Sequence, residues 1–113
     1  MKQKEIKING STYPVVFTIK TMRGFERITG TSFFGRDFKG VGDKTAIVFA
    51  AIVAADENAK VTFEELIDAD KVQTLNDIVE AFTVVNELAD DFFDIPKVEP
   101  KPEAETSGDD SKN

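Results

Sequence analysis

The sequence predicts an α+β fold, in which an N-terminal β-hairpin packs on a bundle of about four helices and is followed by a disordered, acidic C-terminal tail. Three observations predict it. Residues 5–19 alternate apolar and polar side chains around an Asn-Gly pair, and residues 18–91 repeat apolar side chains at helical spacing. From residue 96 onward the chain is rich in proline and charge. We therefore expect a single α+β domain over residues 1–95 and a disordered tail over residues 96–113.

The first segment predicts the hairpin. Residues 5–8 alternate, Asn9 and Gly10 follow, and the alternation resumes over residues 12–19. Asn-Gly suits a type I′ turn because both residues tolerate a positive φ. Pro14 lacks an amide donor, which indicates a strand with an edge facing solvent. The apolar side of the second strand carries Tyr13, Val15, Phe17 and Ile19.

Residues 18–29 predict a first helix. It ends at Gly30, because glycine adopts the left-handed conformation of a helix C-terminus without penalty. Gly24 lowers its helix propensity by about 1 kcal/mol. One side carries Met22, Phe25 and Thr29, and the opposite side carries a basic ridge formed by Lys20, Arg23 and Arg27. A flexible loop rich in glycine and phenylalanine follows and contains Phe33, Phe34 and Phe38.

Three more helices are predicted. Residues 44–57, with Asp43 as N-cap, are apolar on all sides, which is typical of a central buried helix. Thr62 and Glu65 match a capping box that opens a short helix over residues 63–69. The last helix begins at residue 71 or 72 and ends near residue 91. Its apolar stripe comprises Val72, Leu75, Ile78, Val79, Phe82, Val85, Leu88, Ala89 and Phe92, and its acidic face comprises Asp77, Glu80, Glu87 and Asp91.

Composition excludes much of enzyme chemistry. The 113 residues include no Cys and no His, so disulfide scaffolds, cysteine nucleophiles and serine–histidine catalytic units are ruled out. The glycines match no phosphate-binding fingerprint, and residues 56–67 lack the ligand spacing of a calcium loop. We expect no catalytic, metal or cofactor residue and a binding protein rather than an enzyme, although carboxylate chemistry is left open by composition.

Charge is unevenly distributed along the chain. The net charge is −7, yet residues 1–44 hold nine basic and four acidic residues (+5), and residues 45–113 hold five basic and seventeen acidic residues (−12). This argues against a general nucleic-acid binder, which needs a basic excess. The polarity is consistent with head-to-tail self-association or with pairing inside one fold.

No membrane or targeting segment is expected. The longest apolar run, residues 46–55, has ten residues, whereas about 20 are needed to span a bilayer. The N-terminal residues lead into the alternating strand rather than into an apolar signal core. The expected location is the cytoplasm.

Three groups of side chains are candidate partner-binding surfaces. The basic ridge and the acidic face are either ordinary solvated helix surfaces or docking surfaces for oppositely charged partners. Phe33, Phe34 and Phe38, together with Phe92 and Phe93 before the tail, either fold back onto the core or form an exposed aromatic patch. Phenylalanine is enriched at interface centres, so the second option points to a protein partner.

The order of these elements carries a resemblance to a known family. The matching features are Ile8-Asn9-Gly10 with residues 13–17, Phe25-Glu26 with Thr29-Gly30, the alanine-rich apolar helix, residues 61–66, and the long amphipathic helix with Phe82 before an acidic tail. Over residues 3–93 the chain resembles the small tail assembly chaperones of long-tailed bacteriophages and prophages. The resemblance transfers no catalytic residue.

The resemblance implies a non-enzymatic protein of the bacterial cytoplasm that is absent from the mature virion. It would bind the tape-measure protein and recruit tail-tube subunits during tail assembly. From the charge distribution we also expect that copies could align as a homo-oligomer through the basic ridge and the acidic face. The alternative is an acidic decoy, a DNA mimic that occupies the basic groove of a host or phage enzyme. The decoy requires a continuous acidic surface, whereas the chaperone requires apolar surfaces with complementary charge.

Overall fold

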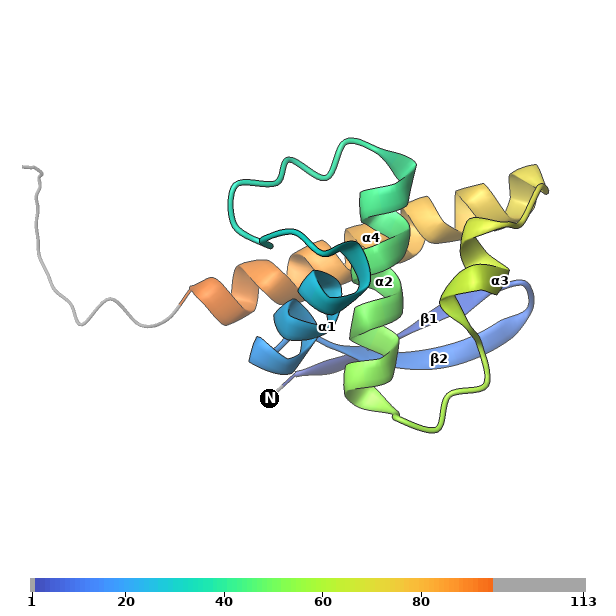
Figure 1. Cartoon of the computed structure of the whole chain (residues 1–113). Coiled ribbons are helices and arrows are strands. Elements are labelled where there is room, and N and C mark those ends of the chain that lie inside the picture. The colour runs from blue at the N-terminus through green and yellow to red at the C-terminus, as the bar shows by residue number, and fades with distance from the viewer. Residues whose placement is uncertain (1, 95–113) are drawn as a thin grey trace, which may run out of the picture.

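The computed structural model describes residues 2–94 and contains a β-hairpin followed by four helices (Figure 1). The predicted α+β architecture is confirmed over these residues, and the predicted tail, residues 96–113, lies outside them. The elements are β1 (Gln3–Ile8), β2 (Ser11–Val16), α1 (Ile19–Thr29), α2 (Val41–Ala55), α3 (Phe63–Ile67) and α4 (Val72–Phe93).

The hairpin has the turn that the sequence predicts. β1 and β2 pair antiparallel, with Ile8 opposite Ser11, and the intervening Asn9 and Gly10 have φ values of 54° and 84°. Positive φ at both turn positions is the signature of a type I′ turn. The inward side chains of the strands, Ile6, Ile8 and Val15, are buried in the core with the helices, and Val16 is buried on the opposite face of the hairpin.

The second strand is shorter than predicted. It ends at Val16, and Ile19, expected on its apolar side, instead opens α1 with 53 % of its surface exposed. The reason is Thr18, whose hydroxyl accepts a hydrogen bond from the amide of Lys20 and whose own amide donates to the Thr21 hydroxyl. These bonds satisfy the free amides of a helix start, so the chain turns helical before the strand alternation runs out. The predicted C-terminus of α1 is confirmed, because Gly30 adopts a left-handed φ of 73°.

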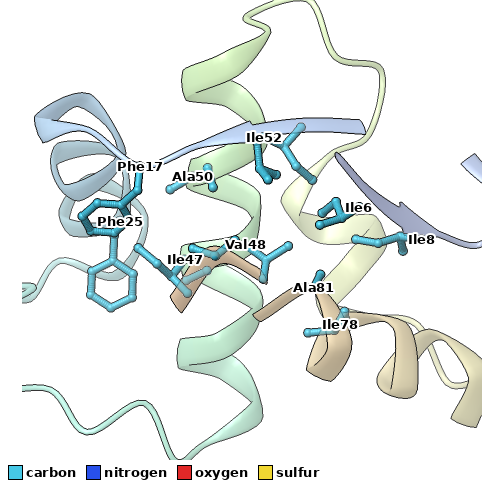
Figure 2. Close-up of a cluster of buried hydrophobic side chains, with 14 of the residues drawn as sticks. Ile6, Ile8, Phe17, Phe25, Ile47, Val48, Ala50, Ile52, Ile78 and Ala81 are labelled. Atoms are coloured by element: carbon cyan, nitrogen blue, oxygen red, sulfur yellow. The ribbon is translucent and has the colours of Figure 1, made fainter. Parts of the chain in front are cut away.

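α2 is the central helix of the molecule, as predicted. It contacts α1, α3, α4 and β2, and Figure 2 shows its side chains between those of the hairpin, α1 and α4. Its start differs from the prediction: the N-cap is Gly40 and the helix begins three residues before Lys44. Asp43 lies inside the first turn instead, where its carboxylate accepts a hydrogen bond from Arg36 at 2.6 Å. The buried residues of α2 are Thr45, Ala46, Ile47, Val48, Ala50, Ala51 and Ile52.

The capping box of α3 is confirmed. The Glu65 amide donates to the Thr62 hydroxyl at 3.1 Å, and the Thr62 amide donates to the Glu65 carboxylate at 2.9 Å. The helix is shorter than predicted and ends at Ile67, leaving Leu66 as its one buried residue.

Only part of the predicted apolar stripe of α4 is buried. Val72, Leu75 and Val79 are 73 %, 39 % and 42 % exposed. α4 contacts α2 and the hairpin, chiefly β1. These contacts cover only one side of its apolar stripe. The side chains that α4 buries are Thr74, Ile78, Ala81, Val85 and Leu88.

No helix within residues 2–94 combines the length and the apolar character needed to cross a membrane.

Candidate functional site

The phenylalanines that the sequence singles out meet in one aromatic cluster. Phe17, at the end of the hairpin, and Phe25, in α1, form its buried base, with 4 % and 0 % of their surfaces exposed. The half-buried Phe33 packs on them, with ring centroids 5.7 Å from Phe17 and 6.0 Å from Phe25. Phe38 lies 5.3 Å from Phe25 and 5.4 Å from Phe33. Phe33 and Phe38 therefore fold back onto the core.

The outer edge of the cluster faces solvent. Phe34 is 66 % exposed and Phe93 is 44 % exposed, and their ring centroids lie 6.3 Å apart. Phe93 also contacts Phe92 at 5.2 Å and Phe17 at 5.8 Å. The α1–α2 loop and the C-terminal end of α4, which are about sixty residues apart in the sequence, thus share one surface. We call Phe34 and Phe93, with Phe33 and Phe92 beside them, the aromatic patch.

The start of the α1–α2 loop is tied to α1. The amide of Phe33 donates a hydrogen bond of 2.9 Å to the Glu26 carboxylate, and the amide of Phe34 donates to the Ser32 hydroxyl at 3.2 Å. These bonds fix the backbone that presents both rings. Glu26, which the sequence linked only to the family resemblance, therefore positions the aromatic patch.

The end of the loop is tied to α2. Lys44 donates hydrogen bonds from its ammonium group to the carbonyl oxygens of Phe38, at 2.6 Å, and Lys39, at 3.1 Å. Phe38 has a φ of 55°, a left-handed conformation that is uncommon for a bulky residue. Such a conformation persists where the surroundings enforce it, and here the Lys44 bond and the ring contacts of Phe38 do so. The predicted flexible loop is thus hydrogen-bonded at both ends.

The basic ridge lies on α1 with all three side chains exposed. Lys20 forms an ion pair with Glu57 at 2.7 Å. The hydrogen bond from Lys20 and its positive charge lower the pKa of the Glu57 carboxyl. Among residues 2–94, neither Arg23 nor Arg27 forms an ion pair.

The acidic face of α4 is engaged largely by the hairpin. Asp91 pairs with Lys2 and Glu87 pairs with Lys4, each at 3.0 Å. Asp77 accepts a hydrogen bond of 3.0 Å from the amide of Asn9 in the hairpin turn. Charge pairing inside the fold, one of the two options that the charge distribution left open, therefore engages Glu87 and Asp91, and Asp77 is held by a hydrogen bond. Glu80, the fourth, is exposed.

Sequence reasoning missed an apolar groove at the other end of α4. It has a volume of about 310 Å³ and lies between the start of α2, α3 and the start of α4. Val41, Ile67, Val72 and Leu75 line it and are each more than one third exposed. Val72 and Leu75 were predicted only as members of the apolar stripe, and the signal for the groove was the width of that stripe, which exceeds what one packed face of a helix uses.

The described residues offer surfaces for protein contact. Within residues 2–94 no three acidic side chains converge as a metal site would require. The chemistry available is burial of apolar surface, aromatic contact and charge pairing. Searches with protein-family models, curated proteins and solved structures found no match to the chain.

Proposed function

We propose that the chain is a tail assembly chaperone of a bacteriophage or prophage, which works in the bacterial cytoplasm and is left out of the mature virion. It binds helical segments of the tape-measure protein through the aromatic patch and recruits tail-tube subunits to them. The observation that carries the proposal is the contact between two exposed phenylalanines, Phe34 and Phe93, on a firmly held aromatic base. Exposed aromatic residues clustered in this way are typical of protein-binding surfaces.

The patch has the chemistry that a helical client needs. An amphipathic helix exposes an apolar stripe that must be covered until it reaches its final partner. Aromatic side chains bury a large apolar area, and the rings of Phe33 and Phe92 support Phe34 and Phe93 from within the molecule. The hydrogen bond that the Phe33 amide donates to the Glu26 carboxylate holds part of this surface in place before a client arrives, which lowers the entropy cost of binding.

The charge pairing favours the chaperone over the acidic decoy. A DNA mimic needs a continuous surface of free negative charge. On α4, Glu87 and Asp91 have lysines of the hairpin region as partners. The same pairs leave fewer free acidic groups for contacts between copies, so the proposal rests on the aromatic patch and not on charge-driven self-association.

The proposal is tested by co-expressing the full chain with the tape-measure protein encoded in the same genome. We expect the chain to raise the amount of tape-measure protein in the soluble fraction and to co-purify with it. The neighbouring genes provide an independent check: a tail-tube gene upstream and a very long, helix-rich gene downstream are expected. A tape-measure protein that is equally soluble without the chain, and that never co-purifies with it, contradicts the proposal.

A further inference from the structure

We propose that the groove between α1 and α2 binds an acidic amphipathic helix of a partner protein. The groove has a volume of about 220 Å³ and is bordered by Lys20 and Arg27 from α1 and by residues of α2. It shares no residue with the aromatic patch, and the two helices that form it lie side by side (Figure 1). The inference goes beyond the chaperone function and does not depend on it.

The groove forms because the residues at the contact between α1 and α2 have small side chains. A Cβ atom at Gly24 would lie 3.3 Å from the Cβ atom of Ala50, so glycine allows the two helices to approach closely there. Gly24 and Ala54 place no large side chain in the groove itself. Small-molecule sites usually enclose about 300–1,000 Å³. A smaller open groove is suited to one or two side chains of a docked segment rather than to a cofactor.

The floor of the groove is apolar and incompletely covered. Ile28, Phe49 and Val53 line it and are each half-buried. The Phe49 ring is supported from α3 by Phe63, with ring centroids 6.0 Å apart. A partner helix that places an apolar stripe here would complete the burial of these side chains, which is the main favourable contribution to such an interface.

The charged side chains at the edge of the groove indicate which charge the partner carries. Arg27 borders the groove and Arg23 lies one turn away on the same helix, and neither forms an ion pair among residues 2–94. Lys20 has one acidic partner, Glu57. Of the two cations that border the groove, Arg27 is therefore left without an acidic partner in the described part of the chain, and Arg23 adds a second positive charge nearby on α1. This positive charge complements a helix with Asp or Glu beside its apolar stripe.

A nucleic acid fits this surface less well than an acidic helix. Nucleic-acid sites contact many phosphates through an extended basic stripe. The groove is bordered by two cations, Lys20 and Arg27, and the surface between them and α2 is apolar. Phosphates placed there would lose water without gaining hydrogen bonds, which is unfavourable.

The test uses the full chain, labelled with ¹⁵N, and a synthetic amphipathic helix as probe. The probe has about 18 residues, since shorter isolated helices are marginal in water, with Leu at i, i+3, i+4 and i+7 and Glu beside the stripe. A second probe carries Lys in place of every Glu, and a DNA duplex is the third. We expect the acidic probe alone to bind and to shift the amide signals of Gly24, Ile28, Ala50 and Ala54.

Two variants and one control separate the groove from the rest of the surface. Arg23→Glu with Arg27→Glu is expected to weaken binding of the acidic probe about tenfold or more, and Ala54→Gln, which fills the groove without changing charge, is expected to weaken it as well. Lys7→Glu with Lys39→Glu changes the net charge equally at exposed positions outside the groove and should leave the affinity unchanged. The amide spectrum of each variant checks that it is folded.

The inference is overturned if the lysine probe or the DNA binds as well as the acidic probe. It is also overturned if both folded groove variants retain full affinity, or if the shifts concentrate at Phe34 and Phe93 or at the groove between α2, α3 and α4. Self-association of the chain that the Arg23→Glu/Arg27→Glu variant abolishes would show that a second copy, and not an acidic helix of another protein, occupies the surface.

Discussion

The aromatic cluster divides its phenylalanines between structure and binding. Phe25 is fully buried beneath Phe33 and Phe38, whereas Phe34 keeps 66 % of its surface exposed. A side chain that is mostly exposed in the folded state contributes little to folding, because the unfolded chain exposes it as well. Phe34 is therefore available for a partner at little cost to stability.

This division predicts two different outcomes from the same kind of substitution. Phe25→Ala should lower the free energy of unfolding by about 3–5 kcal/mol, because it leaves a cavity in the core. Phe34→Ala should lower it by less than about 1 kcal/mol, because it empties no buried space. Urea titrations of the two variants provide the comparison. Equal losses would show that Phe34 belongs to the core.

Glu57 offers a prediction on pH. The hydrogen bond and charge of Lys20 lower its pKa in the folded state, so ionised Glu57 favours folding above the ordinary pKa of a glutamate. That contribution is lost as the pH falls through the lowered value of the folded state. An NMR titration of the Glu57 carboxyl should give a higher pKa in the Lys20→Met variant than in the wild type. An unchanged value would mean that the ion pair does not form in solution.

The sequence correctly predicted the roles of individual residues where those roles depend only on neighbouring residues in the chain. The Asn9-Gly10 turn, the Gly30 helix end and the Thr62–Glu65 capping box are all confirmed, and each depends on residues within one turn of the chain. Asp43 was assigned as an N-cap and is instead a partner of Arg36. The choice between these roles depends on where the preceding loop places Arg36, which the sequence around Asp43 does not encode.

α3 is a five-residue helix and depends on its first turn. Removal of the Thr62 hydroxyl leaves the Glu65 amide without its capping partner. Thr62→Ala should therefore lower the free energy of unfolding by about 1 kcal/mol, as measured by thermal or urea unfolding, with Thr83→Ala, an exposed threonine within α4, as the control. A loss no larger than that of the control would show that the capping box contributes nothing to stability.

α4 illustrates what periodicity predicts and what it does not. The spacing of apolar residues correctly predicted a long helix, and the observed element spans Val72–Phe93. It did not predict which part of the apolar arc is buried, because that depends on which elements pack against the helix. α2 and β1 cover Ile78 and Val85. Leu75, which lines the groove between α2, α3 and α4, and Val79 remain exposed.

The observed orientation of α4 is tested by two matched truncations. Ile78 is 2 % exposed and Leu75 is 39 % exposed. Ile78→Ala should lower the free energy of unfolding by about 2–5 kcal/mol, and Leu75→Ala should cost less than about 1 kcal/mol. Urea unfolding of both variants gives the two values. A larger loss for Leu75→Ala would mean that α4 is rotated relative to this structure.

The molecule as a whole brings together residues that are distant in the sequence. The aromatic cluster joins the end of the hairpin, the α1–α2 loop and the last turn of α4, and Lys2 and Lys4 at the start of the chain meet the carboxylates of α4. Residue types and spacing singled out the phenylalanines of the loop and of the end of α4 and the acidic residues of α4, but not Phe17, Phe25 or the lysine partners. Which groups meet was not predictable, since it follows from the packing of α4 across the hairpin and α2.

The molecule exposes two separate apolar surfaces, one at each end of α4. The aromatic patch lies at the C-terminal end of α4 and the groove lined by Val72 and Leu75 at its N-terminal end. α4 spans Val72–Phe93, so the two surfaces are separated by roughly 25–32 Å along the helix. A substitution at one end therefore serves as a control for the other.

The most direct test is the affinity of the full chain for the tape-measure protein encoded with it, measured in solution for three forms of the chain. Phe34→Ser with Phe93→Ser should weaken binding at least tenfold relative to the wild type, because each substitution removes an exposed aromatic contact at the centre of the interface. Val72→Ser with Leu75→Ser should leave the affinity unchanged. Full affinity in the phenylalanine variant, or no binding by the wild type, would contradict the role of the aromatic patch as the client-binding surface.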